Sequence, residues 1–197
     1  MKELLAFLDS IAPMEPELCD FITERLQTKS IPAKSFLLKA GQVSHHIYFL
    51  EKGLVRCYYM LGNRDISSWF MRESDVVVSV NSFFTQSPSV EYIQAMEDCE
   101  VQYISHAELE EAYRTFVGFN IHGRKILTHY YCLSEQRAAS MRSMKAHERY
   151  AWLKQHEPWL LDRVPRKYIS SYLGVTEATM THTRYSLAKK KSATINR

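Results

Sequence analysis

Apolar side chains recur with different periods along this chain and divide it into three stretches. Over residues 1–29 the spacing is helical, and Leu4 and Leu8 share one face. Pro13 and Pro16 bracket a break in this pattern. The pattern therefore predicts two short N-terminal helices separated by a turn.

From about residue 30 to residue 105 the pattern changes to short extended runs rich in β-branched and aromatic residues: FLLKA, IYFL, LVRCYYM, ISSWF, DVVVSV, EYIQAM and CEVQYI. Gly62 and Asn63 separate two of these runs and predict the tip of a hairpin. Gly41 and Gly53 mark tight corners. Many short strands with no helices between them predict an antiparallel, jelly-roll-like β-roll.

The helical period returns at about residue 106, first in HAELEEAYRTF and then in the longer NIHGRKILTHYYCLSEQRAASMRSM. Ile126, Tyr130 and Leu133 recur along the longer helix at spacings of four and three. Such a stripe must be buried against something. One alternative is packing on the chain's own β-domain, and the other is a two-fold seam. We predict the seam, so the helix is expected to form a homodimer.

A helix-turn-helix is predicted within residues 164–190, VPRKYISSYLGVTEATMTHTRYSLAKK. The motif needs a small residue where the helices cross and a glycine in the turn, and Ser170 and Gly174 meet both needs. Apolar side chains must close the corner, and four have suitable spacings: Ile169, Leu173, Val175 and Met180.

The second helix of this motif is expected to begin after Thr176, a good N-cap, with Glu177 at the positive end of the helix dipole. Its first turns are the part that enters a major groove. Seven residues are therefore candidate DNA contacts: Thr176, Glu177, Thr179, Thr181, His182, Arg184 and Lys189. Thr183 departs from the pattern, because an apolar residue usually packs at its position. An ordinary helical hairpin is the alternative reading.

Charge is distributed unevenly. Residues 1–136 hold 12 Lys/Arg and 18 Asp/Glu, a formal charge of −6, whereas residues 137–197 hold 13 and 4, a charge of +9. An acidic body with a basic C-terminal third favours a polyanionic partner such as double-stranded DNA. A merely solvated basic surface is the alternative.

The sequence gives little support for a membrane protein, a secreted protein, a metal-binding protein or an enzyme. No apolar run approaches the roughly 20 residues of a membrane span, and the N-terminus does not resemble a signal peptide, so a cytoplasmic protein without membrane contact is expected. The four cysteines are too scattered for a metal knuckle or a CxxC pair, and no metal site is expected. The sequence has no HExxH, no GxSxG and no glycine-rich phosphate loop, so an enzyme is not expected. His45 and His46 are consecutive at a strand start, so we expect them on opposite faces.

The order of these parts resembles the CRP/FNR superfamily of regulators over nearly the whole chain. The resemblance rests on Gly41 and Gly53, on IQAMEDCEVQYIS, and most specifically on HERYAWLKQHEPWLLDRVPRKYISSYLGVTEATMTHTR. It implies an α+β protein with a cyclic-nucleotide-binding-domain β-roll, a long dimerisation helix and a C-terminal winged-helix-type helix-turn-helix. The expected boundaries are 1–117 for the sensor, 118–144 for the dimer helix and hinge, and 145–197 for the DNA-binding domain.

The resemblance also implies an effector cassette, at the positions of Ser79, Ser82, Phe83, Ser89 and Val90. In members that bind cyclic AMP, a Glu holds the ribose and an Arg the cyclic phosphate. Ser79 and Ser89 stand in those two places here, so cyclic nucleotides are doubtful effectors, and Phe83 and Phe84 are candidates to fill the roll. The N-terminal part has only Cys19 in place of the cysteine cluster of oxygen-sensing members, and residues 58–98 have no His or Cys to serve as the axial ligand of haem-sensing members.

The function expected is therefore DNA-binding transcription regulation, with RNA polymerase and an unknown small-molecule effector as further partners and no cofactor. The base-reading positions also depart from common family residues, since Glu177, Ala178 and His182 occupy them. The alternative is a sensor or interaction protein of the same fold that has lost sequence-specific DNA binding.

Overall fold

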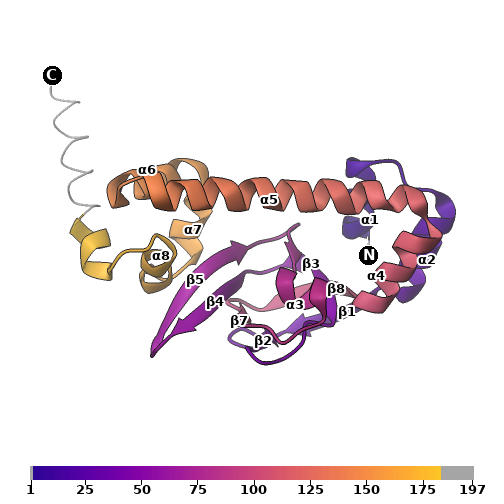
Figure 1. Cartoon of the computed structure of the whole chain (residues 1–197), viewed down its shortest axis with the longest axis horizontal. Helices are drawn as coiled ribbons and strands as arrows, with labels where there is room; N and C mark the ends of the chain where they lie inside the picture. Colours follow the sequence, from indigo (N-terminus) through magenta and orange to yellow (C-terminus); the bar gives the residue numbers. More distant parts are fainter. Residues whose placement is uncertain (1, 183–197) are drawn as a thin grey trace, which may run out of the picture. The chain divides into compact units, whose positions relative to one another are not determined.

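A computed structural model describes residues 2–182 of the chain (Figure 1). The chain divides into two compact units. Among the described residues, the first comprises 2–60 and Ser68–Tyr130, and the second comprises Leu61–Ser67 and 131–182. No described helix has a stretch apolar enough to cross a lipid bilayer.

The first unit begins with two short helices, α1 (Lys2–Ile11) and α2 (Pro16–Arg25), as the apolar spacing predicts. The expectation that helix extends to residue 29 is wrong. Strand β1 (Gln27–Ile31) begins directly after α2 and pairs antiparallel with β8 (Cys99–Ser105). The ladder with β8 satisfies the backbone of this segment and overrides its local preference.

Two four-stranded antiparallel sheets form the predicted β-roll. The first has the order β1-β8-β3-β6, and the second has the order β2-β7-β4-β5. The strands not yet given are β2 (Phe36–Leu38), β3 (His46–Lys52), β4 (Val55–Leu61), β5 (Arg64–Met71), β6 (Val76–Val77) and β7 (Glu91–Ala95). Gly62, at a φ of 60°, lies at the tip of the β4–β5 hairpin, so the predicted hairpin is confirmed.

Apolar side chains from both sheets meet in one core, which includes Leu50, Val55, Ile93 and Val101. Gly53 lies at the β3–β4 corner with a φ of +103°, and a Cβ there would lie 2.7 Å from the sulfur of Cys99. Only glycine fits both the backbone angle and this close approach.

The sequence-based expectation of no helix among the strands is wrong at one place. Helix α3 (Val80–Thr85) lies between β6 and β7, and it begins at the last residue of the run DVVVSV and occupies part of the stretch between that run and EYIQAM. Phe83 is fully buried on α3, in a cluster with Leu18, Leu109 and Phe119 from the helices of this unit. Burial of the Phe83 side chain against these helices stabilises the short helix.

Helix α4 (His106–Thr115) follows β8 and opens with a capping box, in which Ser105 and Glu108 satisfy each other's backbone N–H groups. A short 3₁₀ turn, Val117–Phe119, leads into the long helix α5 (Asn120–Ser143). Figure 1 shows α1, α2 and α4 gathered at the start of α5.

The second unit continues with three further helices, α6 (Ala146–His156), α7 (Pro158–Arg163) and α8 (Arg166–Tyr172). Residues 177–182 are also helical. Any wing after this last helix falls outside the described residues. The α+β class and the C-terminal helical corner agree with the sequence-based prediction.

Candidate functional site

Helix α8 ends in a tight turn at Gly174, which has a φ of +66°. The N–H of Val175 donates to the carbonyl of Ser170 at 3.0 Å, and the N–H of Gly174 donates to that of Ser171 at 3.1 Å. This pair of bonds is the Schellman arrangement that closes a helix on a left-handed residue. The sequence-predicted role of Gly174 in the turn is therefore confirmed.

Small and apolar side chains fill the inside of this corner. Ser170 is 2% exposed, and its hydroxyl donates to the carbonyl of Arg166 at 2.9 Å. The sulfur of Met180, on the second helix, lies 3.2 Å from the same hydroxyl. Ile169 and Leu173 are buried beside them. The corner has the packing that a helix-turn-helix requires.

The second helix presents its polar side chains outward. Thr176 Oγ1 accepts the N–H of Thr179 at 3.2 Å, so Thr176 is the N-cap that the sequence predicts. Glu177, Thr181 and His182 are exposed, whereas Met180 is buried. Thr183, Arg184 and Lys189 were singled out in the sequence and lie outside the described residues.

Two arginines of the basic C-terminal third bind the carbonyl end of α8. Arg137 Nη2 donates to the carbonyl of Tyr172 at 2.7 Å, and its guanidinium lies 3.6 Å from the centre of the Tyr172 ring. Arg149 Nε donates to the carbonyl of Leu173 at 3.0 Å. Burial lowers the pKa of Arg137 from its ordinary value. These two cations support the corner itself, so part of the +9 charge is structural.

In the first unit, the cassette positions meet around a carboxylate that the sequence analysis did not single out. Ser79 Oγ donates to Glu91 Oε1 at 2.7 Å and lies 3.1 Å from Ser89 Oγ. The N–H of Glu91 donates to Ser89 Oγ at 3.0 Å. Ser79 and Ser89 are 2% and 5% exposed. The structure thus joins the two predicted serines in one hydrogen-bonded cluster and adds an acid to them.

Burial raises the pKa of Glu91, while hydrogen bonds from Ser79 and Tyr59 oppose that rise. Tyr59 lies directly across the β4–β7 ladder from Glu91. A signal for Glu91 was available in the sequence. In β7 the side chains of Ile93 and Ala95 enter the core, and Glu91 belongs to the same alternating set. An acid at a core-facing strand position is the kind of departure that marks a site.

The other cassette positions have different surroundings. Ser82 is buried, and its hydroxyl accepts the N–H of Ser44 at 2.9 Å. Phe83 packs among helices, Phe84 is 38% exposed, and Val90 is 74% exposed. The expectation that Phe83 and Phe84 fill the roll is wrong, because α3 turns Phe83 toward the helical cluster and leaves Phe84 partly in solvent.

Along α5, two of the three stripe residues pack within the first unit. Ile126 lies against the helical cluster. The hydroxyl of Tyr130 accepts the N–H of Val76 at 2.9 Å and donates to Asp75 at 3.3 Å. Leu133 is half-buried, whereas Leu127 and Tyr131 are 45% and 66% exposed. The α5 surface open to a partner therefore contains Leu127 and Tyr131, beside the stripe that the sequence suggested.

Residues 28–116 match the family described as the cyclic nucleotide-binding domain. A comparison with curated protein sequences found no match. The matched range holds both sheets and the cassette, so sequence and structure identify the same region.

Several solved structures share the fold of almost the whole chain. FixK2 from Bradyrhizobium japonicum gives a TM-score of 0.69 at 19% identity, over 84% of this chain and 86% of that chain. A transcriptional regulator of the Crp/Fnr family from Eubacterium rectale gives 0.71 at 13% identity, over 89% and 85%. The catabolite activator protein of Thermus thermophilus gives 0.55 at 16%, over 92% and 87%. The chain thus has the fold of the CRP/FNR transcription regulators, and the resemblance drawn from its sequence is confirmed at that level.

Proposed function

We propose that this protein is a DNA-binding transcription regulator of the CRP/FNR type. The observation that carries the proposal is the corner between α8 and residues 177–182. Its interior is packed on Ser170 and Met180, and the first turns of its second helix are exposed. A helix held in this way by a glycine turn can enter a major groove with its N-terminal residues foremost.

Each exposed side chain of that helix has a role suited to its chemistry. Glu177 can accept a hydrogen bond from cytosine N4, and His182 can donate to a guanine edge or a phosphate. The hydroxyls of Thr176, Thr179 and Thr181 suit phosphate oxygens. From Thr176 to His182 the sequence has no Lys or Arg. The proposal therefore assigns the charged phosphate contacts to Arg184 and Lys189.

The proposal includes a homodimer, because two-fold symmetry matches the paired half-sites of helix-turn-helix operators. The exposed face of α5 that carries Leu127 and Tyr131 supports it, since apolar side chains of this size favour burial. Leu133 is half-buried and lies further along the same helix, within the second unit. RNA polymerase is a further partner of the proposed function.

The proposed input is a small molecule other than cyclic AMP or cyclic GMP. A cyclic phosphate needs a cation or several N–H donors to replace its water. At the cassette it would meet Ser89 in place of an arginine and the Glu91 carboxylate 2.7 Å from Ser79. In its ionised form, the Glu91 carboxylate would repel the negative charge of a cyclic phosphate in this half-buried site.

Fluorescence anisotropy on a library of genomic fragments tests the output. We expect a few fragments to bind with nanomolar to tens-of-nanomolar affinity at physiological salt, and at least a thousandfold more tightly than bulk DNA. His182→Ala should change the preferred base at one position, whereas His147→Ala, an exposed histidine on α6, should not. Equal, weak binding to all fragments would instead support the alternative, a sensor that has lost sequence-specific DNA binding.

A further inference from the structure

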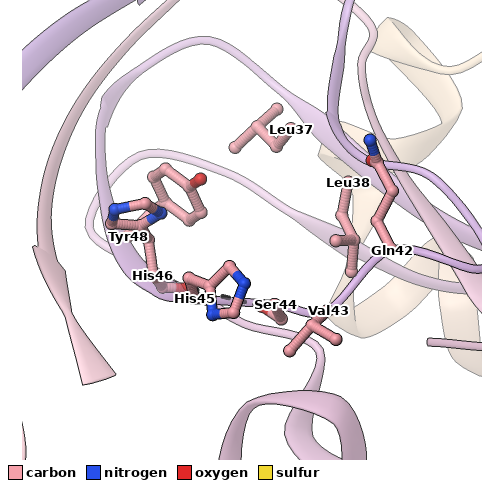
Figure 2. A pocket seen from close by; sticks show the side chains of 8 residues that line it. All are labelled: Leu37, Leu38, Gln42, Val43, Ser44, His45, His46 and Tyr48. Atoms are coloured by element: carbon pink, nitrogen blue, oxygen red, sulfur yellow. Dashed lines mark hydrogen bonds between the residues drawn. The ribbon is translucent and has the colours of Figure 1, made fainter. Parts of the chain in front are cut away.

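A pocket of about 400 Å³ lies where the chain crosses from one sheet to the other between β2 and β3. We call it the corner pocket, and it is lined by Leu37, Leu38, Gln42, Val43, Ser44, His45, His46 and Tyr48. Figure 2 shows the two histidines and Tyr48 along one side, with Leu38, Gln42 and Val43 along the other. Its volume lies within the range of small-molecule sites.

His45 and His46 both line this pocket, although His46 lies beside Tyr48 and Tyr103 whereas His45 lies beside Gln86. The pleat alternates only within a strand, and His45 precedes β3, which begins at His46. Two imidazoles from consecutive residues therefore line one space.

The hydrogen bonds of Gln86 fix the tautomer of His45. Gln86 Nε2 donates to the carbonyls of Phe83 and Ser44, at 2.6 and 3.2 Å, so Gln86 Oε1 is the acceptor that faces His45. His45 Nδ1 lies 3.1 Å from that oxygen and must carry a proton. In the neutral ring, Nε2 then remains an acceptor for another group.

The second histidine, His46, lies among aromatic side chains. The ring of His46 lies edge-on to Tyr103 at 5.1 Å between centroids, and Tyr48 lies 5.6 Å from the same tyrosine. Burial, and next the neighbouring charge of His45, lower the pKa of His46. The neutral form of this ring is therefore favoured, and it offers a polarizable face with hydrogen-bonding nitrogens.

None of the eight lining residues is Asp, Glu, Lys or Arg. Leu37, Leu38 and Val43 supply apolar surface, and Ser44, Gln42 and Tyr48 supply uncharged hydrogen-bonding groups. A fully charged ligand would lose its water here without gaining an ionic partner, and that loss is unfavourable. An uncharged ring compound with a polar edge matches both kinds of lining.

The wall of the corner pocket is hydrogen-bonded to the cassette. The N–H of Ser89 donates to the carbonyl of Gln42 at 2.8 Å, and the N–H of Gly41 donates to the carbonyl of Ser89 at 2.7 Å. The N–H of Ser44 donates to Ser82 Oγ at 2.9 Å. A group that orders residues 41–45 therefore also restrains both ends of the cassette segment 82–89.

We propose that the corner pocket is an effector site separate from the cassette. Its ligand is a small uncharged aromatic or heteroaromatic molecule that hydrogen-bonds His45 and stacks against His46 and Tyr48. Its binding restrains the cassette segment through Gln42 and Ser44.

Indole is the probe, since it is an uncharged ring with one N–H donor, and benzoate and benzylamine are its charged counterparts. Saturation-transfer NMR and titration should give a dissociation constant for indole of about a millimolar or below. Val43→Trp, which fills the pocket, should weaken binding at least tenfold, and Val117→Trp, at a 77% exposed position, should leave it unchanged. His45→Ala should weaken it about two- to tenfold, and His147→Ala should not.

Amide hydrogen exchange of residues 82–89 should slow on addition of indole. Absence of indole binding at ten millimolar would overturn the proposal, as would equal binding to the Val43→Trp protein. Benzoate or benzylamine binding as tightly as indole at the same site would overturn the assigned ligand class. Unchanged exchange in the cassette with indole bound would overturn the coupling. None of these measurements uses DNA, so their failure is distinct from failure of the proposed regulator function.

Discussion

Polar side chains point inward in the cassette of the first unit, whereas they point outward at the helix-turn-helix corner of the second unit. Ser79, Ser89 and Glu91 turn inward and hydrogen-bond one another. At the corner, Glu177 and His182 are exposed, and the interior is apolar apart from Ser170. The first arrangement is internally satisfied, whereas the second leaves its hydrogen-bonding capacity for a partner.

This difference indicates that the cassette and the corner differ in what their polar side chains can bind. The corner has the geometry that the proposed entry into a major groove requires. The cassette keeps only the backbone of a nucleotide site, because its charges differ from those a cyclic phosphate needs. A fold can therefore be shared while the ligand it accepts is decided by a few side chains.

The largest expected effect concerns salt. If about six phosphates are contacted, the logarithm of DNA affinity should fall with a slope of roughly −5 against the logarithm of salt concentration. Affinity should then drop about a thousandfold between 50 and 200 mM salt, as measured by fluorescence anisotropy. An affinity that does not change over this range would contradict the electrostatic argument, and the exposed side chains of the corner would then not serve phosphate binding.

Cyclic AMP and cyclic GMP provide the next test. Losing a buried charge-assisted contact typically costs about 2–5 kcal/mol, or roughly 30-fold to several thousandfold in affinity. Titration calorimetry should therefore give dissociation constants well above ten micromolar for both nucleotides. Ser89→Arg combined with Glu91→Gln should tighten binding, because it supplies a cation and removes the carboxylate. A value of ten micromolar or below for the unchanged protein would sink the claim.

The dimer face can be sharpened with two neighbouring tyrosines. Tyr131→Glu places a charge on the exposed face of α5 and should weaken self-association about 10- to 100-fold. Tyr130→Phe removes only the hydroxyl that contacts Val76 and Asp75, so association should stay the same. Analytical ultracentrifugation measures both. If Tyr130→Phe weakened self-association more than Tyr131→Glu did, the dimer interface would instead contain the stripe of Ile126, Tyr130 and Leu133.

Local chemistry made the corner predictable from sequence, and long-range packing hid the rest. The turn at Gly174 and the cap at Thr176 depend on residues within five positions of each other, so their spacing is sufficient. The cluster at Glu91 depends on which residues a sheet brings together, and α5 has apolar side chains on more than one face. Periodicity shows that Ile126, Tyr130 and Leu133 need partners, but it does not show which surface covers each.

Gly174 offers a matched pair with Gly62, because both have a positive φ in the second unit. Gly62→Ala meets no atom within 4 Å and should lower stability by about 1 kcal/mol through the backbone angle alone. Gly174→Ala also places its Cβ 2.6 Å from the terminal methyl of Met141. That methyl can move, so a loss of about 1–2 kcal/mol is expected in urea unfolding. Equal losses of stability in the two variants would show that the Met141 side chain moves aside at no measurable free-energy cost.

The smallest effect concerns Glu91 and the pH dependence of stability. Burial raises the pKa of Glu91 in the folded state above its ordinary value of 4.5, so folding favours the protonated acid. Below the unfolded pKa both states are protonated and Glu91 imposes no penalty. As the pH rises through the folded pKa, the carboxylate must ionise in a half-buried site, and stability falls by the free energy that corresponds to the shift.

Glu91→Gln keeps an amide oxygen that can accept the hydrogen bonds of Ser79 and Tyr59, but it removes this charge. The variant should therefore melt above the parent at pH 7–8, by about 2–4 °C for each kcal/mol of penalty removed, and the gain should vanish near pH 4. Asp75, whose pKa burial also raises, is present in both proteins, so its contribution cancels in the comparison. A variant less stable than the parent at pH 8 would show instead that the ionised carboxylate stabilises the cassette.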